Sequence, residues 1–121
     1  VEAVIHTGEV FAIPSVHPAI ACKAHYQDVI NLANLAKSAG VRRFIYLSSC
    51  EVYGEGGEDY TTEESPVRPL TPYATYKTLV ETDLQAIASA SFSPTILRQA
   101  FAFGASPRMR FDAVLNQMAG L

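Results

Sequence analysis

The sequence predicts an α/β fold, a partial doubly wound parallel sheet made of three β-α units. Strand-type apolar runs alternate with segments whose apolar residues recur every three or four positions, as in amphipathic helices. The middle run is apolar along nearly its whole length, which is typical of a strand covered on both faces by helices. Because three strands are too few for a complete doubly wound sheet, we predict that residues 1–121 form one partial domain.

The first β-α unit is predicted from a short apolar strand at residues 3–5 and a long helical pattern at residues 19–39. The apolar residues of this helix lie at mixed spacings of three and four, so they share one face. Gly40 follows directly, and glycine is the residue most common just after the end of a helix.

The second unit begins with a strand at residues 43–47, and a polar segment rich in glycine and proline at residues 54–69 indicates a loop. A helix at residues 72–90 is predicted next, because Thr71 can cap it and Pro72 suits its first position. The third unit is a strand at residues 94–97 and an amphipathic helix at residues 111–121.

Composition excludes several classes of protein. The net charge is −3, from 9 basic and 12 acidic residues, so no nucleic-acid partner is expected. The apolar runs are too short to span a membrane. The three histidines and two cysteines lack the spacing of a metal site. With no secretory signal visible, we expect a cytoplasmic protein with reduced thiols, and the strand-like start at residue 1 suggests a fragment.

Polar residues follow the predicted strands at the places where open parallel sheets bind ligands, outside the carboxyl ends of the strands. These segments are residues 6–9, 48–51 and 99–104. The second is the richest in reactive groups, because two hydroxyls, a thiol and a carboxylate follow one another there. We therefore expect a binding or catalytic site at this edge of the sheet.

Tyr73 and Lys77 lie four residues apart at the start of a predicted helix, so their side chains share a face about 6 Å apart. A neighbouring ammonium lowers the pKa of a phenol from its usual value of about 10. Such a tyrosine can remove a proton from a hydroxyl, and a serine hydroxyl can stabilise the developing charge. The alternative is an exposed lysine beside a half-buried tyrosine.

A series of motifs runs along almost the whole chain: Ser48-Ser49-x-x-Val52-Tyr53-Gly54, Thr62-Glu63, Pro69-x-x-Pro72-Tyr73-x-x-x-Lys77-x-x-x-Glu81, Leu97-Arg98 and Phe103-Gly104. In order and spacing, they resemble the extended short-chain dehydrogenase/reductase family, in its NAD-dependent epimerase/dehydratase branch. The resemblance implies the C-terminal half of a Rossmann-like NAD(P)-binding domain and a nucleotide-sugar substrate. It also implies a homodimer that forms through the helices at residues 19–39 and 72–90.

The resemblance implies a catalytic triad of Ser49, Tyr73 and Lys77, with Lys77 also holding the nicotinamide ribose of NAD or NADP. The other implied cofactor contacts, beside those of Tyr73 and Lys77, are His6, Thr7, Gly8, Ser48, Gln99 and Ala100. The implied substrate contacts are Ser49, Glu51, Phe101 and Arg108. For Arg108 and its neighbour Arg110, contact with a substrate diphosphate competes with the simpler interpretation of solvated charges at a helix start.

The sequence departs from the family at several positions. The phosphate-binding loop Gly-x-x-Gly-x-x-Gly is absent, and the acidic glycine cluster at residues 54–58 indicates a surface loop. The usual His-Leu-Ala-Ala is replaced by His6-Thr7-Gly8-Glu9, and His25 stands where the family usually has asparagine. We therefore expect the isolated chain to bind the cofactor poorly and to be inactive.

Cys50 and Glu51 occupy positions where the family's dehydratases carry an Asp-Glu pair. The missing aspartate argues against 4,6-dehydration, which needs two proton-transferring groups, whereas epimerisation does not need this pair. Three hypotheses stay open. The chain belongs to an NAD(P)-dependent sugar-nucleotide epimerase, to a dehydratase or hydroxysteroid-type dehydrogenase of the same family, or to a non-catalytic truncated member that acts as a structural or oligomerising module.

Overall fold

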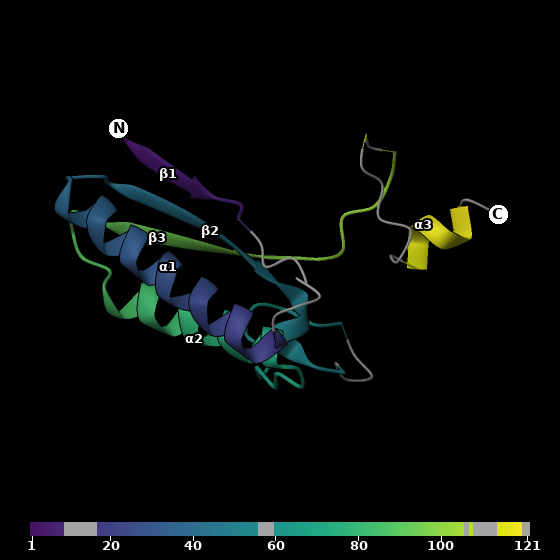
Figure 1. Ribbon diagram of the computed structural model, residues 1–121. Coiled ribbons are helices and arrows are strands. Elements are labelled where there is room, and N and C mark those ends of the chain that lie inside the picture. The colour runs from purple at the N-terminus through teal and green to yellow at the C-terminus, as the bar shows by residue number, and fades with distance from the viewer. Residues whose placement is uncertain (9–16, 56–59, 106, 108–113, 120–121) are drawn as a thin grey trace.

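The computed structural model describes residues 1–8, 17–55, 60–105, 107 and 114–119, and its strands form one three-stranded parallel sheet (Figure 1). The elements in chain order are β1 (Ala3–His6), α1 (Pro18–Ser38), β2 (Arg43–Ser49), the 3-10 turn η1 (Cys50–Tyr53), α2 (Pro72–Ala86), β3 (Ser93–Gln99) and α3 (Val114–Ala119). The alternation of strands and helices confirms the predicted α/β class, with a Rossmann-like partial sheet.

The strands are ordered β1-β2-β3, so neighbours in the chain are neighbours in the sheet. Strand β2 is central, and its carboxyl end extends beyond that of β1, which is paired only as far as His6 beside Tyr46. Pairing of β2 with β3 continues to Ser49 beside Gln99. The residues that follow these strands therefore gather at one edge of the sheet, as the strand-end rule predicts.

Helices α1 and α2 lie side by side on the same face of the sheet (Figure 1). Residues of β2 alternate accordingly: Phe44 and Tyr46 are fully buried under the helices, whereas Ile45 and Leu47 on the other face are half-buried. Among the described residues no helix covers that second face, so the expectation of helices on both faces is wrong for this part of the chain. Right-handed connections explain this, because a strand order that never reverses keeps both crossover helices on one side.

The hydrophobic core lies between this helix pair and the sheet. Its buried members come from α1, β2 and α2 and from the segments next to them, and they are Val29, Ala33, Ala36, Val41, Phe44, Tyr46, Val80, Leu84 and Phe92. Phe44 packs at the centre, with its ring 6.1 Å from that of Phe92. This core fixes α2 against β2, the two elements that carry the predicted triad.

Local signals in the sequence correctly predicted the start of α2 and the end of α1. Thr71 caps α2 by accepting a hydrogen bond from the Ala74 amide at 3.1 Å, and Gly40 follows α1 with a φ of 77°. Helix α2 ends at Ala86, before the predicted end at residue 90, because a tight turn pairs Ser89 with Phe92 and buries the Phe92 ring. The predicted helix at residues 111–121 is described only over α3.

The described helices include none that is long and apolar enough to cross a membrane.

Candidate active site

Ser49 ends β2 and begins the turn η1 at the carboxyl edge of the sheet. Its hydroxyl oxygen accepts a hydrogen bond from the Glu51 amide at 3.2 Å, which caps the turn. The thiol of Cys50 donates to the Arg98 carbonyl of β3 at 3.3 Å. These bonds hold Ser49 and Glu51, both half-buried, in a fixed turn beside the end of β3.

Tyr73 and Lys77 lie in the first two turns of α2, beside the same end of β2. The Lys77 ammonium donates to the Leu47 carbonyl at 2.9 Å, two residues before Ser49. It also lies 5.4 Å from the centre of the Tyr73 ring and 4.8 Å from that of Tyr46. Lys77 is only 2% exposed, so the alternative interpretation of an exposed lysine is wrong.

A small pocket adjoins this pair between the two long helices. Its volume of about 10 Å³ leaves room for one water molecule. The side chains that line it come from α1, β2 and α2, and they are Cys22, His25, Tyr26, Tyr46, Tyr73, Tyr76, Lys77 and Val80. His25 therefore shares a pocket with Tyr73 and Lys77, and its ring lies 5.6 Å from that of His6. One departure from the family pattern, His25, thus lies beside His6, the histidine that the family pattern also has.

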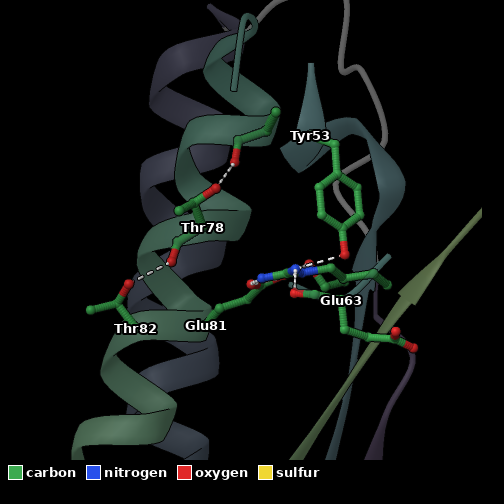
Figure 2. A network of polar contacts seen from close by, with 8 residues as sticks. Tyr53, Glu63, Thr78, Glu81 and Thr82 are labelled. Carbon is green, nitrogen blue, oxygen red and sulfur yellow. Dashed lines mark hydrogen bonds and ion pairs between the residues drawn. The ribbon is translucent and has the colours of Figure 1, made fainter. Parts of the chain in front are cut away.

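Sequence reasoning missed a network of polar contacts centred on Arg98 (Figure 2). The Arg98 guanidinium in β3 donates to the Glu81 carboxylate of α2 at 2.7 Å and to the Tyr53 hydroxyl of η1 at 2.7 Å. Ser48 in β2 donates to the other carboxylate oxygen of Glu81 at 2.5 Å. The bond to Glu81 raises the pKa of Arg98 above its ordinary value, so the guanidinium keeps its charge across the accessible pH range.

A signal for this network was present in the sequence. Glu81 lies one turn after Lys77 on the same helix face, and Arg98 directly follows the predicted strand at residues 94–97. A buried carboxylate and a nearly buried guanidinium are expected to pair, because either charge alone would be costly to bury. Spacing alone did not show that the two would meet, since they belong to different elements.

Gly54 fixes the path of the chain after η1. Its φ is 71°, and a Cβ atom there would lie 2.4 Å from the Arg68 carbonyl oxygen. Any other residue would therefore collide with the backbone of the segment that leads into α2. The close approach, together with the Arg68 amide bond to the Val52 carbonyl at 2.9 Å, links the Ser49 turn to the start of α2.

The remaining predicted site residues are distributed unevenly. Thr7 and Gly8 after β1 and Gln99, Ala100 and Phe101 at the end of β3 are exposed at the carboxyl edge of the sheet. Ser48 lies at the same edge, but its hydroxyl is buried and bonded to Glu81. Glu9, Arg108 and Arg110 lie outside the described residues. The structure thus places Lys77 beside Tyr73 and the end of β2. The roles of all these residues in binding cofactor or substrate stay predictions.

The fold and the site define a Rossmann-like α/β domain with serine, tyrosine and lysine at the carboxyl edge of its parallel sheet. Residues 1–120 match the family model described as "NAD dependent epimerase/dehydratase family". The chain belongs to this family, in agreement with the resemblance noted from its motifs.

Known relatives agree with this assignment. The chain is 33% identical over 91 residues to a UDP-glucose 4-epimerase of Vibrio cholerae, a match that covers 72% of this chain and 27% of the epimerase. Among solved structures, it resembles RMD from Pseudomonas aeruginosa complexed with NADPH, with a TM-score of 0.82, 25% identity, and coverage of 98% of this chain and 42% of the other.

A third relative is the NAD-dependent NDP-hexosamine 5,6-dehydratase TunA, which is involved in tunicamycin biosynthesis. The two structures have a TM-score of 0.79 and 30% identity, with 97% of this chain and 39% of TunA covered. The matches span between 15% and 27% of the length of the curated relatives. Both epimerases and dehydratases are therefore similar to this chain, which corresponds to a minor part of each.

Proposed function

We propose that this chain supplies the Ser-Tyr-Lys part of an NAD(P)-dependent sugar-nucleotide epimerase. The observation that carries this proposal is the burial of Lys77 beside the Tyr73 ring, with its ammonium bonded to β2 two residues before Ser49. The burial of this lysine indicates a structural or functional role, since lysine is rarely buried unless its charge is paired. The parallel sheet also presents these residues at the edge where such domains bind their ligands.

In this proposal the positive charge of Lys77 stabilises Tyr73 as a phenolate, which accepts the proton of a sugar hydroxyl and becomes a neutral phenol. An ammonium carries three donors, so its bond to Leu47 is compatible with further bonds to the phenol and to a cofactor ribose. Ser49 donates to the same sugar oxygen and orients it. When bound, NAD or NADP would supply the acceptor for the hydride of the carbon that bears this oxygen, and the same hydride would return to the other face of that carbon.

The Cys50 side chain favours an epimerase over a dehydratase. Its thiol is exposed and bonded to a backbone carbonyl of β3, so no second acid follows Ser49 at this position. Glu51 alone offers one carboxyl group, whereas elimination of a hydroxyl uses one group to remove a proton and another to protonate the leaving oxygen.

A location in the cytoplasm stays a prediction.

A non-catalytic role as a structural or oligomerising module is the second candidate. The order of the described strands runs in one direction, whereas dinucleotides bind in doubly wound sheets at the point where the strand order reverses. The described sheet contains no such reversal. We therefore propose that the chain by itself holds the catalytic residues without a complete site for the cofactor.

A fluorescence titration of the 121-residue chain with NADH, repeated with NADPH, tests this point. We expect no saturation below about 1 mM cofactor, which corresponds to a binding free energy weaker than about −4 kcal/mol. A Lys77→Met variant serves as the control and should behave identically. Saturable micromolar binding that the Lys77→Met change abolishes would mean that the chain assembles its own cofactor site, and the non-catalytic candidate would be excluded.

We further propose that the chain forms a homodimer through α1 and α2. Large apolar side chains are exposed on these helices, among them Leu35 at 69% and Leu79 at 45%. A second copy of the chain could cover them, because α1 and α2 lie side by side on the same face of the sheet (Figure 1).

Sedimentation equilibrium of a Leu35→Glu/Leu79→Glu double variant tests the dimer. We expect its dimerisation constant to weaken by roughly 30-fold or more, since charges would be buried at the centre of the interface. Ile5→Glu on the uncovered face of the sheet is the matched control and should dimerise as the unchanged chain does. If the unchanged chain is monomeric at high micromolar concentration, the dimer proposal is wrong.

A further inference from the structure

We propose that Glu81 is a positioning residue that holds α2 in register against the end of β2, and thereby fixes Lys77 and Tyr73 relative to Ser49. The proposal rests on the proposed function for the chemical roles of these three residues. The geometric part, in which Glu81 sets the position of Lys77, stands on the contacts of the chain itself.

Two consecutive residues of β2 contact two residues of α2 that are one helical turn apart. The Leu47 carbonyl accepts from the Lys77 ammonium at 2.9 Å, and the Ser48 hydroxyl donates to the Glu81 carboxylate at 2.5 Å. Because hydrogen bonds need donor–acceptor distances of about 2.5–3.2 Å, both contacts depend on where α2 lies along β2. A shift of α2 along β2 would break both contacts together.

The Glu81 carboxylate is itself held from a second direction, by a guanidinium that is fixed in turn. Glu81 is 4% exposed, and its second oxygen accepts from Arg98 of β3 at 2.7 Å. The same guanidinium donates to the Tyr53 hydroxyl at 2.7 Å and to the Glu63 carbonyl at 3.4 Å (Figure 2). A carboxylate bonded to a strand hydroxyl and to a fixed guanidinium cannot turn away without leaving a buried charge unpaired, so it acts as a rigid reference point.

The other polar tie of α2 has a different effect. The Tyr26 hydroxyl of α1 donates to the Asp83 carboxylate at 2.5 Å, and this bond raises the pKa of the Tyr26 phenol. It joins α1 to α2, and it does not involve a residue of the sheet. Asp83 is therefore an acidic residue on the same helix, two positions from Glu81, whose loss should leave the alignment of Lys77 with Leu47 intact.

The experiment measures the acetylation rate of each lysine in the unmodified chain by mass spectrometry, in the native state and without cofactor or substrate. Lys23 is exposed and acts as the internal reference. In a Glu81→Gln variant we expect Lys77 to react about tenfold faster than in the unchanged chain, because a hydrogen bond between charged groups no longer holds α2. The rate of Lys23 should not change.

The matched control is Asp83→Asn, in which Lys77 should react within about twofold of its original rate even though the melting temperature falls. Ser48→Ala removes the bond between Ser48 and Glu81 but leaves the ion pair of Glu81 with Arg98. It should raise the acetylation rate of Lys77, and of no other lysine, in the same way. It keeps the proposal testable where Glu81→Gln does not fold. Equal acceleration in Asp83→Asn, or none in Ser48→Ala, would overturn the proposal. Full turnover of a Tyr73→Phe variant in an active chimaera would contradict the proposed function and leave this result unaffected.

Discussion

Changing Tyr73 to phenylalanine is expected to lower turnover by a factor of about 10² to 10⁴, the range that a general acid or base contributes. The phenol oxygen is the group that removes the hydroxyl proton in the proposed reaction, and phenylalanine keeps the ring that packs near Lys77. The measurement is the conversion of UDP-glucose to its C4 epimer. It uses a chimaera in which this chain replaces the matching segment of the Vibrio cholerae epimerase.

The matched control for this variant is Tyr76→Phe, because Tyr76 lies three residues further along α2 and lines the same small pocket. Its turnover should stay within about threefold of that of the unchanged chimaera, since surrounding contacts are preserved and no proton is transferred there. Both variants should melt at nearly the temperature of the parent. If Tyr73→Phe keeps full turnover in an active chimaera, Tyr73 is not the proton acceptor.

Changing Arg98 to alanine is expected to destabilise the chain by about 3–5 kcal/mol, the usual effect of removing one partner of a buried ion pair. The Arg98 side chain is 20% exposed and that of Glu81 is 5% exposed, so the carboxylate would lose its counter-charge in a place that water barely reaches. Urea unfolding followed by circular dichroism measures the loss. It is a large fraction of the total stability of a small domain, which is about 5–15 kcal/mol.

The pH dependence of this effect follows from the direction of the pKa shift. Folding raises the pKa of Arg98, so the stability it contributes is present below the pKa of the unfolded guanidinium and is lost only as the pH rises through the folded value. Both values lie far above neutrality, and the difference between Arg98→Ala and the unchanged chain should therefore stay constant across the neutral range. Exposed Arg42 is the control, and its alanine variant should change the unfolding free energy by less than about 0.5 kcal/mol. A loss below about 1 kcal/mol in Arg98→Ala would show that Glu81 is solvated.

Local chemistry made much of the fold predictable. The Thr71-Pro72 start of α2 and the Gly40 end of α1 depend on contacts within a few residues, so a single sequence contains the whole signal. The predicted class of sheet, the family and the places of Tyr73 and Lys77 followed from spacing and motif order. The end of α2 was predicted too late, because the turn that stops it depends on the burial of Phe92 in the core.

Contacts between distant parts of the chain could not be predicted in the same way. The Arg98–Glu81 pair joins residues that are 17 apart, and the Ser48–Glu81 bond joins residues that are 33 apart. At such separations the spacing of two residues in the sequence predicts neither the distance between their side chains nor which residues will pair. The network is therefore visible only in the three-dimensional structure. The same holds for the meeting of His6 with His25, which lie on different elements. The prediction about the second face of the sheet was wrong for the described residues, because an apolar strand has the same sequence pattern whether helices cover one of its faces or both.

The order of the strands has a consequence for how the chain folds. Because β1, β2 and β3 are arranged in the sheet as they are in the chain, each new strand can add to the edge of those already formed. None of the described strands has to enter between two others, and each crossover joins sequence neighbours, which keeps the loops that must close short. The described elements can therefore associate in chain order, with β1, α1 and β2 packing together before α2 is complete. The contacts of Glu81 with Arg98 require β3 and would therefore form last. They would stabilise a packing of α2 against β2 that the apolar core has already established.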